Sequence, residues 1–170
     1  MAGAIGARRA GVKPLGADAY ERVLAAGAVL LTAAVLAALA RGAPHWDRVP
    51  ATIWVHLLTM LVALVLTPVL LLRRRGDRRH RLLGTIWVGA MLATALGSFA
   101  IRQVNHGGFS FIHLLSIWVT IQAPLIWWSA RTHRVAMHRS AVRGMVTGAL
   151  LIAGFFTFPF NRMLGAWLFG

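Results

Sequence analysis

Five long apolar segments dominate the chain and restrict the folds open to it. They cover residues 23–40, 52–72, 82–101, 109–129 and 141–160. A helix rises about 1.5 Å per residue, so each segment approaches the roughly 20 residues needed to cross a hydrocarbon core of about 30 Å. Membrane strands would alternate apolar and polar residues, and runs such as "LVALVLTPVLLL" do not. We therefore expect an all-α membrane bundle of five transmembrane helices, forming a single domain over residues 1–170.

The basic residues are distributed unevenly between the two ends of these segments. The chain has 18 Lys and Arg against 4 Asp and Glu, a net charge of +14. Fourteen basic residues fall in the tail over residues 1–22 and around the second and fourth connections, and the other four are Arg41, Arg48, Arg102 and Arg162. The positive-inside rule then predicts a cytoplasmic amino-terminal tail and an outer carboxyl terminus. Because topology accounts for the charge, we do not expect nucleic acid as a partner.

The chain has no cysteine. This excludes structural disulfides, thiolate-ligated iron–sulfur clusters and covalently attached c-type haem. Redox functions that depend on cysteine-bound cofactors are therefore excluded.

An internal repeat relates the second and third segments to the fourth and fifth. One unit begins at Val55 with "VHLLTML" and the other at Ile112 with "IHLLSIW". Each unit continues with a proline (Pro68 or Pro124), a basic connection and a His-Arg pair that opens the next segment. The repeat predicts two similar helical hairpins, with the first segment outside them.

His56 and His113 occupy equivalent positions in the two units. Each lies about five residues into a segment that runs from the outer side inward, so both imidazoles are expected roughly 6 Å below the outer end. The residues on their helical faces are mostly small or hydroxylated: Thr52, Thr59, Ala63 and Thr67 with His56, and Phe109, Ser116, Thr120 and Ala123 with His113. Such residues face other helices in lipid, so both histidines are expected to point into the bundle. Facing imidazoles can supply both axial nitrogens of a haem iron, whereas an isolated one could simply bond a neighbouring hydroxyl.

His80 and His138 repeat this relation at the cytoplasmic ends of the third and fifth segments. They form a second candidate pair of haem ligands, and electrons could cross the membrane between the two sites. The alternative is that they are solvated or contact lipid phosphate, as histidines among arginines commonly do. The remaining histidines have no partner in the repeat and are expected to be solvated: His45, His106 and His133. His106 is also a candidate for an outer substrate site.

Several stretches resemble a bacterial membrane-protein family known only as domain-of-unknown-function family 2306. The resemblance rests on "HRLLGTIWVGAMLATALGSFAI", "FSFIHLLSIW", "HRSAVRG" and "FFTFPFNRMLGAWLFG" and covers roughly residues 53–170. It implies four histidine-bearing spans in the inner membrane of a bacterium, and it implies no particular activity.

The histidine arrangement is also similar to that of transmembrane cytochromes of the b-561 type. Those proteins bind two haems with one histidine on each of four consecutive spans, and they pair alternate helices. The resemblance implies that His56 pairs with His113 and His80 with His138. The present chain departs from that scheme in having one predicted span fewer.

These features predict a b-type haem protein, a transmembrane oxidoreductase in the broad sense, that exchanges electrons with a quinone or another small reductant. Two axial imidazoles leave the iron no open position, which favours electron transfer over oxygen activation. An alternative is a non-haem accessory or structural subunit, in a homo-oligomer or a larger membrane complex against which its seven tryptophans could pack. These tryptophans are more simply interpreted as interfacial anchors. A small transporter is less favoured because no Asp or Glu lies within any apolar segment.

Overall fold

The computed structural model describes residues 16–101 and 111–170, and the regular structure in these ranges is helical without any strand. The bundle is built from α1 (Ala19–Arg41), α2 (Ala51–Leu72), α3 (Arg78–Ser98), α4 (Phe111–Arg131) and a composite fifth stretch. That fifth stretch runs through α5 (Val135–Met145), the π-helical η3 (Val146–Ile152) and the short α6 (Ala153–Phe155). Two further short helices are η1 (Ala43–Arg48) and α7 (Met163–Phe169). The all-α class is confirmed for this part of the chain.

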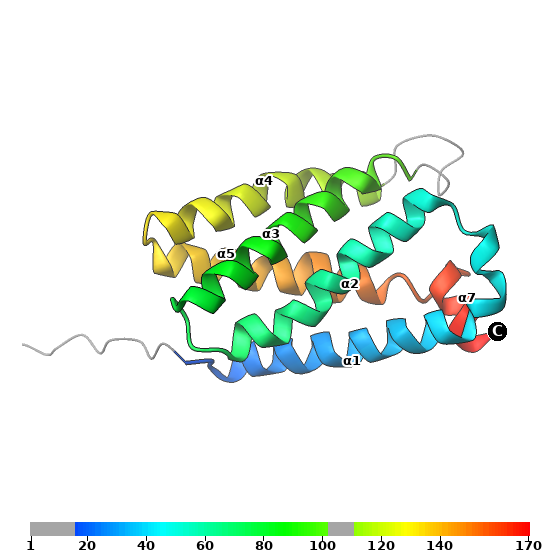
Figure 1. Ribbon diagram of the computed structural model, residues 1–170, viewed down its shortest axis with the longest axis horizontal. Coiled ribbons are helices and arrows are strands. Elements are labelled where there is room, and N and C mark those ends of the chain that lie inside the picture. Colours follow the sequence, from blue (N-terminus) through cyan, green and yellow to red (C-terminus); the bar gives the residue numbers. More distant parts are fainter. Residues whose placement is uncertain (1–15, 102–110) are drawn as a thin grey trace, which may run out of the picture.

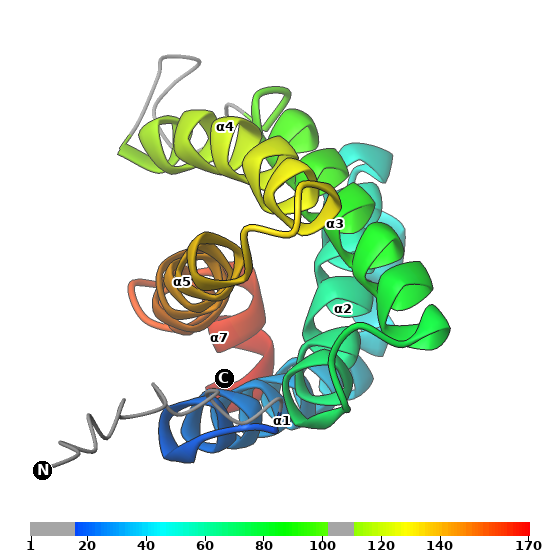
Figure 2. The same cartoon turned by 90° about the vertical axis from the view of Figure 1, so that its left-hand side faces the viewer.

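Helices that follow one another in the sequence also pack side by side. α2 packs against α1 and α3, and α4 packs against α3 and α5. η3 and α7 contact α1, so the end of the chain returns to its beginning. Figure 2 shows α1 to α4 as an arc, with α5 between the two ends of the arc. As a result α2 and α4 flank α3, while α3 and α5 flank α4.

The two ends of the bundle differ in charge. The start of α1 and the α2–α3 and α4–α5 connections lie at one end, and η1 and α7 lie at the other (Figure 1). The first end, here called the arginine-rich end, holds most of the described arginines: Arg22, Arg73, Arg74, Arg75, Arg78, Arg79, Arg81, Arg131, Arg134, Arg139 and Arg143. The opposite end holds Arg41, Arg48 and Arg162, while Arg8, Arg9, Lys13 and Arg102 lie outside the described residues.

Three helices of the described chain, α1, α2 and α3, are long and apolar enough to cross a membrane. α4 has 21 residues, and η3 divides the fifth stretch into shorter elements. Large apolar side chains are exposed on the outside of the bundle, including Leu30, Leu58 and Leu114, while hydroxylated residues such as Thr67 and Ser116 are buried inside. An outer surface with so many large apolar side chains is compatible with contact between the helices and a lipid bilayer.

α1 and α3 begin earlier than the apolar segments that predict them. α1 starts at Ala19 rather than at residue 23 because Asp18 and Glu21 form a capping box, in which each side chain accepts the other's backbone N–H. α3 starts at Arg78 rather than at 82 because the Asp77 side chain accepts the backbone N–H of His80. Part of the predicted tail over residues 1–22 is therefore helical.

The α2–α3 and α4–α5 hairpins are the two hairpins that the repeat predicts, and Pro68 and Pro124 lie inside α2 and α4. Helix-internal prolines are tolerated in membrane bundles because neighbouring groups satisfy the freed backbone. The interpretation of all seven tryptophans as interfacial anchors is wrong for Trp87. This residue is 3% exposed, and its indole N–H donates to Thr67 Oγ1 at 2.9 Å, which joins α3 to α2 in the core.

Candidate functional site

His56 is held against the end of α3 by a hydrogen bond that defines its protonation. Its Nδ1 atom lies 3.2 Å from the Ser98 hydroxyl, and that hydroxyl donates its own hydrogen to the Thr94 carbonyl at 2.8 Å. Since a hydroxyl has a single hydrogen, Ser98 must accept from His56, and Nδ1 carries the proton. The Nε2 atom of the neutral ring then has a free lone pair, and an imidazole in this tautomer can bind a metal through Nε2.

His113 lies in the first turn of α4 and is 4% exposed. Its ring centroid is 6.0 Å from that of Phe99, with the rings tilted by 39°, and its Nε2 atom is buried. Phe99 directly follows Ser98, so His56 and His113 contact consecutive residues at the same end of α3. The structure therefore brings the predicted outer pair to one level of the bundle, on the two helices that flank α3.

The small and hydroxylated faces predicted around these histidines are largely buried. Ala63 and Thr67 of α2, and Ser116 and Ala123 of α4, lie in the core. The prediction is wrong for Thr52, which is exposed because it lies in the first turn of α2. Phe109 lies outside the described residues.

His138 and His80 are located at the arginine-rich end. The Nδ1 atom of His138 lies 3.0 Å from the carbonyl oxygen of Ile126 in α4. A carbonyl can only accept, so this Nδ1 also carries the proton and leaves Nε2 as the basic atom. The Nδ1 atom of His80 is buried and has no hydrogen-bond partner within the described residues. The helices that carry these two histidines, α3 and α5, both pack against α4.

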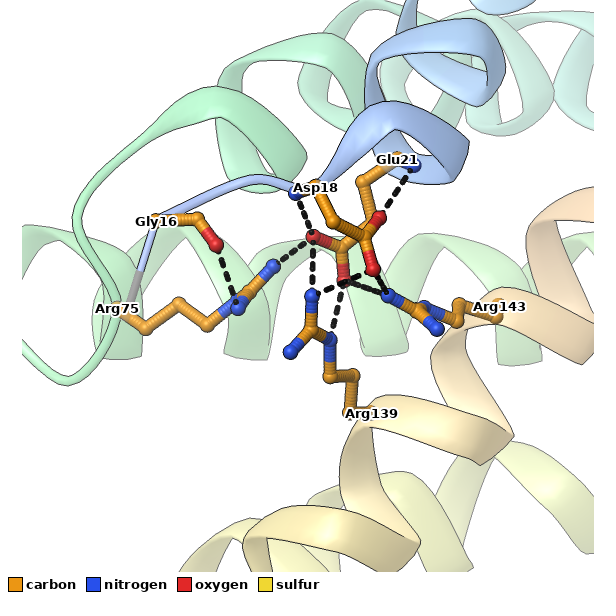
Figure 3. A network of polar contacts seen from close by, with 6 residues as sticks. All are labelled: Gly16, Asp18, Glu21, Arg75, Arg139 and Arg143. Atoms are coloured by element: carbon orange, nitrogen blue, oxygen red, sulfur yellow. Dashed lines mark hydrogen bonds and ion pairs between the residues drawn. The ribbon is translucent and has the colours of Figure 1, made fainter. Parts of the chain in front are cut away.

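A cluster of two acids and three arginines, the carboxylate cluster, lies at the same end (Figure 3). Its members are Asp18, Glu21, Arg75, Arg139 and Arg143. Glu21 is 1% exposed and accepts from Arg139 Nε at 2.7 Å and from Arg143 Nη2 at 3.1 Å, while Arg75 also pairs with it. Asp18 pairs with Arg139 at 2.9 Å and with Arg143. The cluster joins α1, the α2–α3 connection and α5, and its five side chains carry a net charge of +1.

Sequence reasoning missed the carboxylate cluster. The signals that could have found it are the Asp-x-x-Glu capping box at Asp18 and Glu21 and the helical spacing of Arg139 and Arg143, which places both guanidinium groups on one face. The backbone N–H of Glu21 holds the pKa of Asp18 below its ordinary value, burial opposes this effect, and Arg143 adds to it. Asp18 is therefore charged at neutral pH and available to the arginines.

Two of the other three histidines lie in described parts of the chain. His45 in η1 and His133 in the α4–α5 connection are exposed, as predicted, and His106 lies outside the described residues. No group of three or more His, Asp or Glu side chains in residues 16–101 and 111–170 could hold a metal ion together.

Comparisons with protein families, with curated proteins and with solved structures find no match to this chain. Function is therefore derived from the residues and their geometry.

Proposed function

We propose that this protein is a five-span membrane protein that binds b-type haem and transfers electrons. In this proposal α4 and the continuous helical path from α5 through η3 to α6 are the fourth and fifth spans. The arginine-rich end faces the cytoplasm of a bacterium and the opposite end faces outward, which follows from the positive-inside rule. The resemblance of the histidine arrangement to b-561-type cytochromes supports the same assignment.

The observation that carries the proposal is the setting of His56 and His113 at the end of α3. The Ser98 hydroxyl orients the His56 ring and accepts the proton carried by Nδ1 of that ring. The lone pair of Nε2 is then available to bind the haem iron. Phe99 packs beside the His113 ring. When bound, haem supplies a one-electron iron couple, and two imidazole ligands favour simple electron transfer.

His80 and His138 are proposed to hold a second haem near the cytoplasmic face. Support comes from the buried Nδ1 atom of His80, which has no hydrogen-bond partner in the described chain, and from the Ile126 carbonyl that sets the tautomer of His138. A quinone or another small reductant is the proposed electron partner. A homo-oligomer or a larger membrane complex is compatible with the lipid-facing surface.

The test is a reduced-minus-oxidised visible spectrum, with haem quantification, of protein purified from haem-sufficient cells. Wild type is compared with His56→Ala, His113→Ala and a matched control, His45→Ala, which removes an exposed imidazole at the same end. We expect a low-spin b-type spectrum in wild type and control, and loss of the outer haem in both site variants. Retention of the full signal in either site variant would contradict the ligand assignment.

A colourless wild-type protein would contradict haem binding altogether. The accessory-subunit hypothesis would then be tested by co-purification with membrane partners, and the transporter hypothesis by solute flux into liposomes that contain the protein alone.

A further inference from the structure

Two arginines at the α4–α5 connection lie over neighbouring indole rings. The Cζ atom of Arg131 is 4.5 Å from the ring centroid of Trp127, and the Cζ atom of Arg134 is 4.5 Å from the ring centroid of Trp128. Both indoles are 40% exposed. A guanidinium stacked in this way still presents its N–H groups at the edge, and it loses less side-chain entropy when those groups bind an anion.

The acids of the chain cannot serve as that anion. The chain has four of them. Two of the acids belong to the carboxylate cluster and are bound by its three arginines. Asp77 pairs with Arg73 at 3.0 Å. Asp47 lies in η1 at the opposite end of the bundle. No acid of the chain therefore pairs with the two stacked arginines, and their guanidinium groups can bind an anion from another molecule.

The surface beside these arginines is apolar in the way that a lipid chain requires. Ile121 and Leu125 lie one helical turn apart on α4, and Trp128 continues the same exposed face toward the connection. Indoles at the end of such a face mark the level of lipid headgroups, and guanidinium groups bind phosphate through paired hydrogen bonds. A molecule that joins a phosphate to acyl chains fits both features at once.

The geometry points to a binding site for the headgroup phosphate of an anionic phospholipid, formed by Arg131 and Arg134 on the platform of Trp127 and Trp128. The arginine-rich end contacts the anionic cytoplasmic leaflet in the orientation that the positive-inside rule gives. The acyl chains lie along the exposed face of α4. This site is independent of haem binding.

Retention of lipid by the purified full-length protein tests the site. The protein is reconstituted in vesicles of equal parts phosphatidylglycerol and phosphatidylcholine, extracted, and examined by mass spectrometry of the intact protein–lipid complex. The matched control for Arg131→Gln/Arg134→Gln is Arg78→Gln/Arg79→Gln, which removes two exposed charges from the same end. Neither control arginine has a ring or ion-pair contact within the described residues.

We expect wild type to retain phosphatidylglycerol in preference to phosphatidylcholine. The site variant lowers this retention about 25-fold, since each arginine that binds the headgroup contributes about fivefold. The control changes it less than about twofold, because its arginines do not bind the phosphate. Trp127→Leu/Trp128→Leu keeps every charge and also lowers retention, because the guanidinium groups lose their platform. This variant tests the site even where the arginine variant is poorly expressed.

Three results would overturn the inference. Equal losses in the two arginine variants would mean that total charge alone attracts lipid. Equal retention of the two lipids by wild type would mean that the site does not select an anionic headgroup. Displacement of phosphatidylglycerol by excess inorganic phosphate would assign the site to free phosphate instead.

Discussion

Replacement of Glu21 by Gln removes the central charge of the carboxylate cluster without changing the size of the side chain. The carboxylate accepts hydrogen bonds from Arg75, Arg139 and Arg143, which come from the α2–α3 connection and from α5. The variant therefore leaves three guanidinium groups around a neutral amide. The amide oxygen can still accept the backbone N–H of Asp18, so the cap of α1 is retained.

The loss of stability depends on how deeply Glu21 and its arginine partners are buried. Removal of one member of a buried ion pair typically costs about 3–5 kcal/mol. The Glu21 side chain is 2% exposed, but the three arginine side chains are 17–27% exposed, so water partly solvates them once the carboxylate is lost. We therefore expect the free energy of unfolding to fall by about 2–3 kcal/mol, below the fully buried range.

The assay is equilibrium unfolding of the purified protein in mixed micelles, followed by far-UV circular dichroism. Asp47→Asn is the matched control, because it neutralises an exposed acid in η1 at the opposite end and is expected to change stability by less than about 0.5 kcal/mol. An effect of Glu21→Gln as small as that of the control would refute the view that the cluster holds the arginine-rich end together.

Three further predictions concern packing and pH. Gly42→Ala would place a methyl group in steric overlap with the indole ring of Trp167 and should cost at least about 1–3 kcal/mol by displacing α7. The control Gly89→Ala meets nothing within 4 Å and should be neutral or stabilising in thermal unfolding. Trp87→Phe removes the indole N–H that joins α3 to α2 and should lower stability by about 1 kcal/mol in the same assay. The backbone N–H of His80, together with the side chain of Arg73, holds the pKa of Asp77 below its ordinary value. The Asp77 carboxylate is protonated more readily in the unfolded chain than in the folded one, so its charge stabilises the fold above about pH 4. This stabilisation is lost as pH falls through the lowered pKa. Asp77→Asn should therefore show a weaker loss of stability in acid when stability is measured against pH.

The helices could be predicted from the sequence because lipid contact demands long apolar stretches, and the repeat identified the α2–α3 and α4–α5 hairpins. Helix starts could not be read in the same way. They depend on the side chains of Asp18 and Asp77, which lie among charged residues outside the apolar segments and act through local hydrogen bonds. The capping box at Asp18 was nevertheless a usable local signal.

Long-range side-chain contacts were beyond the reach of the sequence. Arg139 and Glu21 are 118 residues apart, and Glu21 belongs to the one long helix outside the repeat. The tautomer of His56 depends on Ser98, which is 42 residues away and whose own hydrogen is committed to a carbonyl. Equivalent positions in a repeat predict that two histidines lie at the same depth in the membrane. They do not predict which atoms of α3 orient each ring, because this depends on how the helices pack in three dimensions.

The most direct measurement of haem ligation by His56 and His113 is low-temperature electron paramagnetic resonance of the oxidised, purified protein. We predict low-spin ferric signals typical of two imidazole ligands, and the signal of the outer haem is lost or becomes high-spin when His113 is replaced by Ala. A wild-type protein with no low-spin ferric signal, or a signal unchanged by that replacement, would contradict the proposed function.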